Sequence, residues 1–178
     1  MKYLLISFLS LFFIKSSFAQ KSTTPCACCT PEFKQFDFWI GNWDVYDTLG
    51  NKVGENKILT AQDSCLIQEN WKSKGQTGIS NNYYNKLDST WNQVWVDNSG
   101  TVLVLKGKRE SNKMILKSEK AKGKKGRYYF NQITWENNAN GTVTQTWDVL
   151  FEDGTLITRV FQGIYKRKLI PKKNTNKK

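Results

Sequence analysis

TWNQVWVDNSGTVLVLKGK, residues 90–108, is the stretch that decides the fold. Apolar and aromatic residues alternate there with polar ones in two runs, 90–97 and 101–109, which is the pattern of half-buried β-strands. The runs are separated by Asn98-Ser99-Gly100, residue types that accept the positive φ of a tight turn. We therefore predict an antiparallel hairpin at the centre of the chain.

Runs of the same kind, rich in Val, Ile, Thr, Tyr and Trp, recur on both sides of this hairpin. In all, strands are predicted at 42–47, 53–61, 65–73, 79–87, 90–97, 101–109, 113–120, 127–136, 142–151 and 155–166. Further turn signals are Leu49-Gly50-Asn51, Asn140-Gly141 and Asp153-Gly154. Pro31 and the apolar spacing that follows it predict one short helix over 31–40.

About ten short strands joined by tight turns indicate an all-β antiparallel meander. A meander of this length avoids exposed edges by closing on itself, so we predict a small antiparallel barrel with one short N-terminal helix. A two-sheet sandwich is the alternative.

The chain divides into four predicted parts. Residues 1–19 have a charged start, an apolar core and a small-x-small ending, and are predicted to be a signal peptide. Residues 20–30 form a Cys-containing linker, 31–168 the β-barrel domain, and 169–178 a basic disordered tail. We therefore expect an exported protein, periplasmic or secreted, and no later stretch is long enough to span a membrane.

The net charge of +12 is unevenly distributed. Residues 106–127 carry ten Lys or Arg and two Glu, and 166–178 carry seven Lys or Arg and no acid. These basic residues are not interleaved with stacking aromatics, so nucleic acid is not an expected partner. Solvated charge is the simplest interpretation, and weak binding to anionic envelope surfaces is the alternative.

Four cysteines, Cys26, Cys28, Cys29 and Cys65, are candidates for disulfides. An even count in an exported chain favours pairing, and Cys65 is expected to join one of the other three. A thiolate site for a soft metal such as Cu(I), or free thiols, are the alternatives.

Alternation along the strands places aromatic rings and polar groups on one common face. A cavity with this face inward would let the rings supply contact area and the polar groups orient a small-molecule ligand. The candidate ligand-binding residues are Glu69, Trp71, Trp91, Gln93, Trp95, Tyr129, Asn131, Gln145 and Trp147. The alternative is a filled core in which each amide satisfies a neighbouring polar group.

The absence of histidine excludes Ser-His-Asp and Cys-His catalysis, imidazole metal sites and His-ligated haem. No nucleotide-binding or hydrolase motif is present, so we expect no cofactor and no metal. Paired carboxylates are the remaining acid–base machinery. The candidates are Glu69, Asp97, Glu136 and Asp148, although a turn role for Asp97 and solvation for Asp148 are the simpler interpretations.

Several segments together match the pattern of one bacterial family. They are Phe36 to Val45, Cys65 with Glu69-Asn70-Trp71, Asn82-Tyr83-Tyr84, Trp91 to Asp97 with Gly100, Ile133-Thr134-Trp135, Gln145-Thr146-Trp147 and Gly163-Ile164-Tyr165. On these segments the chain resembles the bacterial lipocalin-like (calycin-like) domain of unknown function, number fifteen seventy-nine. The resemblance implies an all-β, lipocalin-like barrel and carries over no catalytic residue.

Three functions therefore compete. The leading hypothesis is a non-catalytic exported barrel that binds a small, partly polar molecule. The second is an enzyme that uses Glu69 as general acid or base. The third is an envelope surface protein that acts through its basic hairpin and tail.

Overall fold

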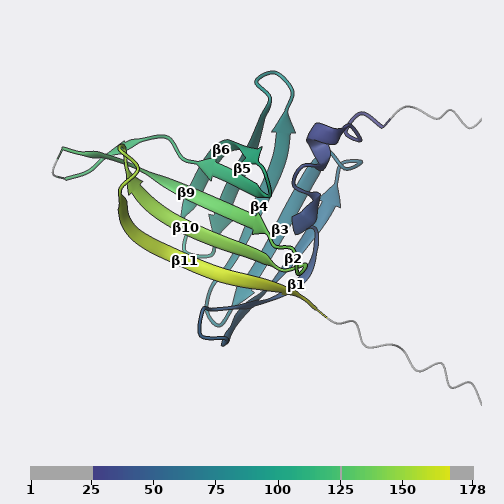
Figure 1. Cartoon of the computed structure of the whole chain (residues 1–178), viewed down its shortest axis with the longest axis horizontal. Helices are drawn as coiled ribbons and strands as arrows, with labels where there is room; N and C mark the ends of the chain where they lie inside the picture. The colour runs from purple at the N-terminus through teal and green to yellow at the C-terminus, as the bar shows by residue number, and fades with distance from the viewer. Residues whose placement is uncertain (1–25, 125, 169–178) are drawn as a thin grey trace, which may run out of the picture.

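The computed structural model describes residues 26–124 and 126–168 (Figure 1). The predicted signal peptide at 1–19, the first part of the linker and the predicted tail at 169–178 lie outside the described residues. No helix in the described part of the chain has the length and apolarity needed to cross a bilayer.

The described chain forms one antiparallel sheet that closes on itself. Its strands are β1 (Gly41–Tyr46), β2 (Lys52–Ala61), β3 (Leu66–Ser73), β4 (Thr77–Asn85), β5 (Thr90–Asp97), β6 (Val102–Glu110), β7 (Lys113–Lys117), β8 (Ala121–Lys122), β9 (Tyr128–Asn137), β10 (Val143–Phe151) and β11 (Leu156–Arg167). Each strand pairs with its neighbour in sequence except around β8, β11 pairs with β1, and β9 pairs with both β7 and β10. These pairings confirm the closed barrel and exclude the sandwich.

The predicted turns are formed where the sequence indicated them. Gly100 and Gly154 have φ values of 83° and 86°, a backbone conformation in which a side chain would be strained. The prediction differs from the structure after β7, which ends at Lys117 rather than at residue 120. The next residues cross to β8, a short additional strand that pairs with the start of β9 and extends the projecting hairpin seen in Figure 1.

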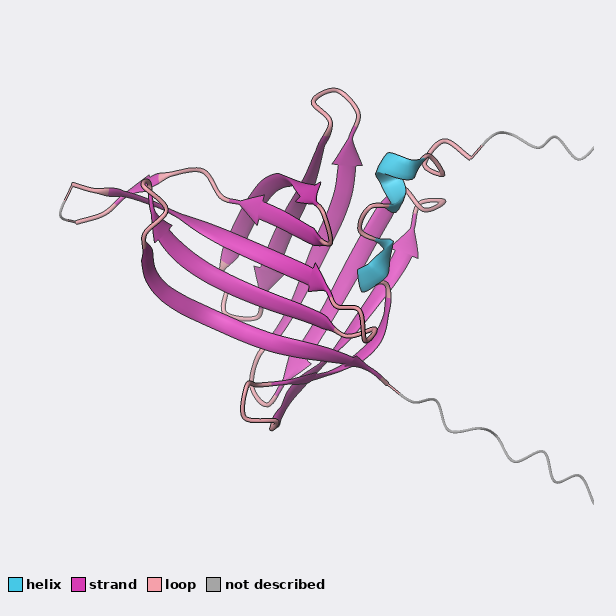
Figure 2. Ribbon diagram, viewed as in Figure 1, coloured by secondary structure: helices cyan, strands magenta, loops and turns pink. Residues whose placement is uncertain are grey.

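Two 3₁₀ turns replace the single helix predicted over 31–40. They are η1 (Pro31–Lys34) and η2 (Asp37–Trp39), and Phe36 between them has φ −108° and ψ 4°, outside the helical range. Phe36 and Trp39 are completely buried, and the Phe36 ring contacts Trp91 and Trp135 at centroid distances of 5.6 and 5.1 Å. Figure 2 shows both turns against one end of the barrel. The buried Phe36 and Trp39 rings fill that end.

The first and last strands are joined beside this closed end. The Trp43 indole donates a hydrogen bond to the Trp39 carbonyl at 2.8 Å. The Arg167 guanidinium lies 4.5 Å above the Trp43 ring and donates to the Ile40 carbonyl at 3.2 Å. The end of β11 therefore holds the η2 turn and β1 together.

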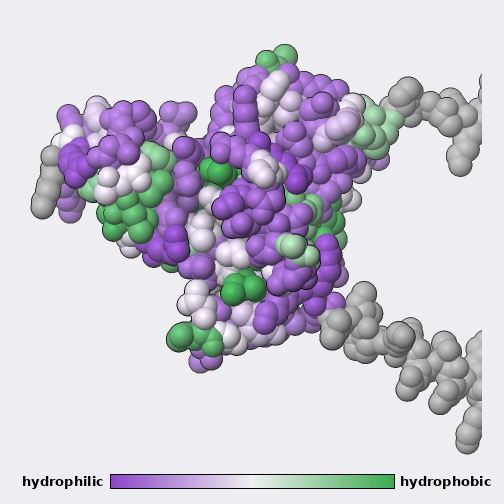
Figure 3. Space-filling view, viewed as in Figure 1, coloured by the Kyte–Doolittle hydropathy of each residue, from purple (hydrophilic) through white to green (hydrophobic). Residues whose placement is uncertain are grey.

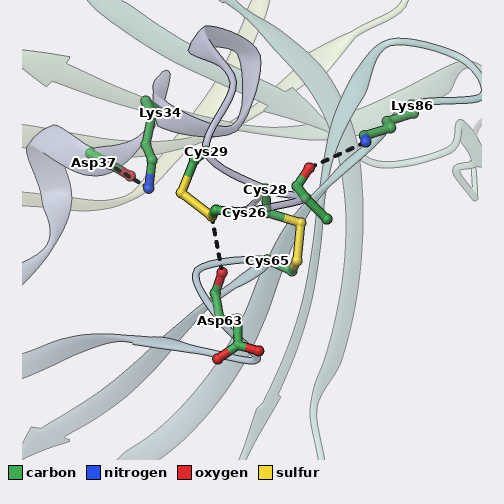
Figure 4. Close-up of a disulfide and its surroundings, with 9 residues drawn as sticks. Cys26, Cys28, Cys29, Lys34, Asp37, Asp63, Cys65 and Lys86 are labelled. Atoms are coloured by element: carbon green, nitrogen blue, oxygen red, sulfur yellow. Dashed lines mark hydrogen bonds and ion pairs between the residues drawn. A yellow bond between two sulfur atoms is a disulfide. The ribbon is translucent and has the colours of Figure 1, made fainter. Parts of the chain in front are cut away.

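All four cysteines are paired. Cys28 is bonded to Cys65, and Cys26 to Cys29. Figure 4 shows the Cys28–Cys65 bond joining the N-terminal segment to the β2–β3 connection. The predicted pairing of Cys65 is confirmed. The alternative thiolate metal site is wrong, because each cysteine sulfur is bonded in a disulfide. Disulfides of this kind are typical of proteins in oxidising compartments.

The outer surface is mostly hydrophilic on the face drawn in Figure 3, with an apolar patch where the ends of β10 and β11 project. Leu156 and Ile157 on β11 are among the exposed apolar residues. Charges on the hairpin formed by β8 and the start of β9 are partly paired, because Arg127 contacts Asp153 at 3.2 Å and Lys120 contacts Glu152. Binding of this hairpin to anionic envelope surfaces stays a prediction.

Candidate functional site

A cavity of about 190 Å³ lies inside the barrel, away from the end that Phe36 and Trp39 close. Five aromatic rings, three glutamine amides, one carboxyl and several aliphatic groups surround it. The lining residues are Glu69, Trp71, Gln76, Gln93, Trp95, Leu103, Ile133, Gln145, Trp147, Val160, Phe161 and Tyr165. Gln76 and Val160 are exposed to solvent, so the cavity opens between the β3–β4 turn and β11.

Glycines in the wall leave room for three of these rings. A Cβ on Gly78 would lie 2.2 Å from the Trp95 ring, closer than any real contact. A Cβ on Gly54 would lie 2.5 Å from the Trp71 ring, and a Cβ on Gly163 would lie 2.6 Å from the Phe161 ring. A glycine in a strand marks such a close approach. The rings consequently lie against the wall.

A directed chain of hydrogen bonds ends on Glu69. It begins at the Ile67 carbonyl, which accepts from the Asn82 amide at 3.1 Å and so fixes its orientation. Asn82 Oδ1 then accepts from Gln93 Nε2 at 2.8 Å. Both amides also donate to Ser80 Oγ, at 2.9 and 3.2 Å. The Ser80 hydroxyl must therefore donate its own proton, and it does so to Glu69 Oε2 at 2.6 Å.

The other carboxylate oxygen of Glu69 accepts from Asn56 on β2, which also contacts Tyr165 on β11. Asn56 Nδ2 donates to Glu69 Oε1 at 2.6 Å and lies 3.4 Å from the Tyr165 hydroxyl. Tyr165 donates in turn to Gln145 Oε1. Asn56 Oδ1 is buried and has no hydrogen-bond partner among the described residues. Each Glu69 oxygen thus accepts one bond from the protein.

Glu69 is the one charged side chain among the buried residues of the described chain, and it is only 4% exposed. Burial raises the pKa of its carboxyl from 4.5 to about 7, although the hydrogen bonds from Ser80 and Asn56 act in the opposite direction. Burial, with the nearby Glu69 charge, also raises the pKa of Tyr165 well above 10. Among the described residues, no Lys or Arg lines the cavity to offset the carboxylate.

Six of the nine residues predicted to bind ligand line this cavity: Glu69, Trp71, Gln93, Trp95, Gln145 and Trp147. The structure places the other three elsewhere. Trp91 packs on Phe36 at the closed end, with its indole donating to Gln35 at 3.2 Å. Tyr129 pairs with β8 in the projecting hairpin. Asn131 accepts a hydrogen bond from the Trp147 indole at 2.8 Å, so it positions a lining ring from behind.

Sequence reasoning missed several residues of the site. The missed lining residues are Gln76, Leu103, Ile133, Val160, Phe161 and Tyr165, and the missed supporting residues are Asn56, Ser80 and Asn82. Ser80 and Asn82 are both completely buried, whereas Ile79 on the same strand is 50% exposed. The alternation in β4 contained the signal, but its more polar face points inward.

The candidate carboxylate pair is not assembled in the cavity. Asp97 accepts from two backbone N–H groups of its own turn, as its position before Asn98-Ser99-Gly100 indicated. Glu136 pairs with Lys113 at 3.3 Å, and Asp148 pairs with Arg159 at 2.8 Å. Glu69 is therefore the single carboxylate among the lining residues.

Comparison with known protein families finds no match for the chain, and comparison with curated proteins finds no relative.

Proposed function

We propose that the protein is an exported, lipocalin-like binding protein that holds a small, partly polar molecule in this cavity. The observation that carries the proposal is the arrangement of Trp71, Trp95 and Phe161 against wall glycines. Rings that only filled a core would cover the centre of the barrel, whereas these leave about 190 Å³ beside them. The closed barrel and the two disulfides support the exported, lipocalin-like part of the proposal.

The size of the cavity limits the ligand. A cavity of about 150 Å³ is sufficient for benzene, whereas drug-sized ligands occupy roughly 300–1,000 Å³. A volume of about 190 Å³ therefore suits a molecule with one ring and a short substituent. Larger ligands would have to project past Gln76 and Val160 into solvent.

Polar atoms that the protein leaves unused give the site its orientation. Both protons of the Gln93 amide are engaged by Asn82 and Ser80, so its Oε1 is available as an acceptor. Gln145 Oε1 accepts from Tyr165, which leaves its Nε2 as a donor. A few convergent polar groups among aromatic walls are typical of small-molecule sites.

Native mass spectrometry of the protein purified from its own envelope tests this proposal. We expect a mass excess that disappears on denaturation, because the ligand is held without a covalent bond. Gly78→Ala is the informative variant, since its new methyl group forces the Trp95 ring into the cavity without removing any lining side chain. Ile79→Ala is the matched control, one residue away and facing outward.

The excess should be lost in Gly78→Ala and retained in Ile79→Ala. A bare wild-type mass, or full retention by folded Gly78→Ala, would contradict the proposal.

A second candidate function is catalysis by Glu69, favoured by a pKa of about 7 in a carboxyl that lines a cavity. A general acid or base works best when its pKa lies near the working pH. This function predicts that Glu69→Gln abolishes a turnover that the wild type shows on a panel of small ring-bearing esters, amides and glycosides. No wild-type turnover on that panel would count against it.

A further inference from the structure

The surroundings of the buried Glu69 carboxyl provide hydrogen-bond donors for its negative charge but no positive charge. Every hydrogen bond from Ile67 to Ser80 is directed so that the final proton points at Glu69 Oε2. Asn56 presents a second donor to Oε1. Donors directed at both oxygens favour the ionised form. A buried negative charge is costly unless a positive charge is paired with it. The arrangement around Glu69 supplies hydrogen-bond donors but no cation.

The described residues do not supply that cation. Among the groups that line the cavity, Tyr165 from β11 is the one titratable neighbour of Glu69, and it is neutral. The neighbouring strands contribute Asn56 from β2 and Ser80 from β4, which carry no charge. At the rim, Gln76 donates to another acid, Asp97, at 3.2 Å. Within residues 26–124 and 126–168, no positive charge therefore faces the carboxylate from the strands beside it.

The remaining polar atoms also favour a ligand that donates hydrogen bonds. A carboxylate has about four acceptor positions, and the protein occupies two of those on Glu69. Gln93 Oε1 is a further free acceptor in the wall. Gln145 Nε2 is the opposing donor.

The walls are suited to the rest of such a ligand. Indole rings attract cations through their faces, and Trp71, Trp95 and Trp147 all line the cavity. Their large apolar area also suits a ring of the ligand.

We propose that the ligand is a small organic cation, a protonated primary amine on a body of about one ring. This inference rests on the proposed binding function and specifies its ligand. The ammonium group lies against Glu69 and Gln93, and the apolar body lies among the tryptophans near the mouth. The cation supplies the charge that the directed network lacks, which explains why an unpaired carboxylate is kept in the barrel.

Calorimetric titration with two probes of equal size tests the charge. Benzylamine is protonated at pH 8, and benzyl alcohol is its neutral counterpart. We expect the wild type to bind benzylamine about tenfold or more tightly than benzyl alcohol. Glu69→Gln should remove this preference while still binding benzyl alcohol, and Glu119→Gln, an exposed acid, should keep it.

The pH profile of the wild type gives a measurement that does not depend on a variant. Benzylamine requires the ionised carboxylate, so its affinity should fall about tenfold per pH unit below pH 7, where Glu69 takes up a proton. Benzyl alcohol affinity should stay constant over the same range. A flat benzylamine profile would overturn the inference even if Glu69→Gln failed to fold.

The remaining outcomes separate this inference from the proposed function. Equal binding of the two probes, or a tightly held neutral ligand in the native mass spectrum, would contradict the inference that the ligand is a cation. The proposed binding function would remain. Binding of neither probe together with a bare native mass overturns both.

Discussion

Replacing Glu69 by glutamine should stabilise the folded protein at alkaline pH. Glutamine has nearly the same shape and carries no charge, so it removes the cost of burying a carboxylate. In the wild type, Asn56 Oδ1 has no hydrogen-bond partner among the described residues. If the Asn56 side-chain amide rotates by half a turn, this oxygen can accept a hydrogen bond from the amide of the new glutamine. The opposite oxygen can still accept the Ser80 proton. The variant therefore keeps the network while removing the charge.

The magnitude follows from the pKa of Glu69. Its folded-state value is about 7, above the ordinary value of 4.5, so the folded protein binds this proton more tightly than the unfolded chain. The stabilisation from this proton is complete below pH 4.5 and is lost as the pH rises through 7. The difference corresponds to about 3 kcal/mol. Glu69→Gln should thus match the wild type near pH 4.5 and exceed it by up to about 3 kcal/mol at pH 8.5.

Urea unfolding with the disulfides intact, at both pH values, measures this difference. Thermal unfolding should show the same trend, with a midpoint about 6–12 °C higher for Glu69→Gln at pH 8.5. Glu119→Gln, whose acid is exposed, should behave like the wild type at both pH values. If Glu69→Gln is instead the less stable protein at pH 8.5, the network compensates the charge by itself and the reasoning is wrong.

Three further predictions concern the frame of the site. The double substitution Cys28→Ser with Cys65→Ser should lower the free energy of unfolding by about 4 kcal/mol, because the lost disulfide joins residues 37 apart in the sequence and closes that loop in the unfolded chain. An unchanged urea midpoint would show that the bond does not restrain the unfolded chain. Phe36→Ala should cost about 3–5 kcal/mol, since that ring is completely buried at the closed end, and a loss below 1 kcal/mol would mean that the end is loosely packed. Asn131→Ala should leave the Trp147 indole without its partner, shift tryptophan emission and weaken benzyl alcohol binding about threefold to tenfold, whereas unchanged emission would argue against that contact.

Most of the barrel could be predicted because its determinants are local. Gly50, Gly100, Gly141 and Gly154 mark tight turns, and all four have positive φ in the structure. Once the turns are fixed, antiparallel neighbours follow in order. The short β8 was missed because Ala121–Lys122 has no apolar alternation, and its pairing depends on the course of β9.

The site was harder to predict because alternation indicates which side of a strand a residue faces, and gives no height along the barrel axis. Trp91 and Trp95 share one face of β5, yet the first packs under the η turns and the second lines the cavity. The network around Glu69 was missed for another reason. In β4 the inward residues Ser80 and Asn82 are polar, and their burial depends on partners from β3 and β5.

The predicted gain in stability and the predicted loss of amine binding arise from the same substitution. Our proposal that Glu69 binds a cationic ligand gives a reason for a carboxylate that costs about 3 kcal/mol at alkaline pH where an isosteric amide would not. Proteins depart from the most stable choice mainly at functional sites.

The most direct test of this account is the titration of the Glu69 side-chain carboxyl by carbon-13 NMR, with and without benzylamine. We predict a pKa of about 7 in the free protein, and a lower pKa when benzylamine is bound because the ammonium favours the ionised form. A pKa near 4.5 in the free protein, or a pKa that saturating benzylamine does not change, would contradict the account.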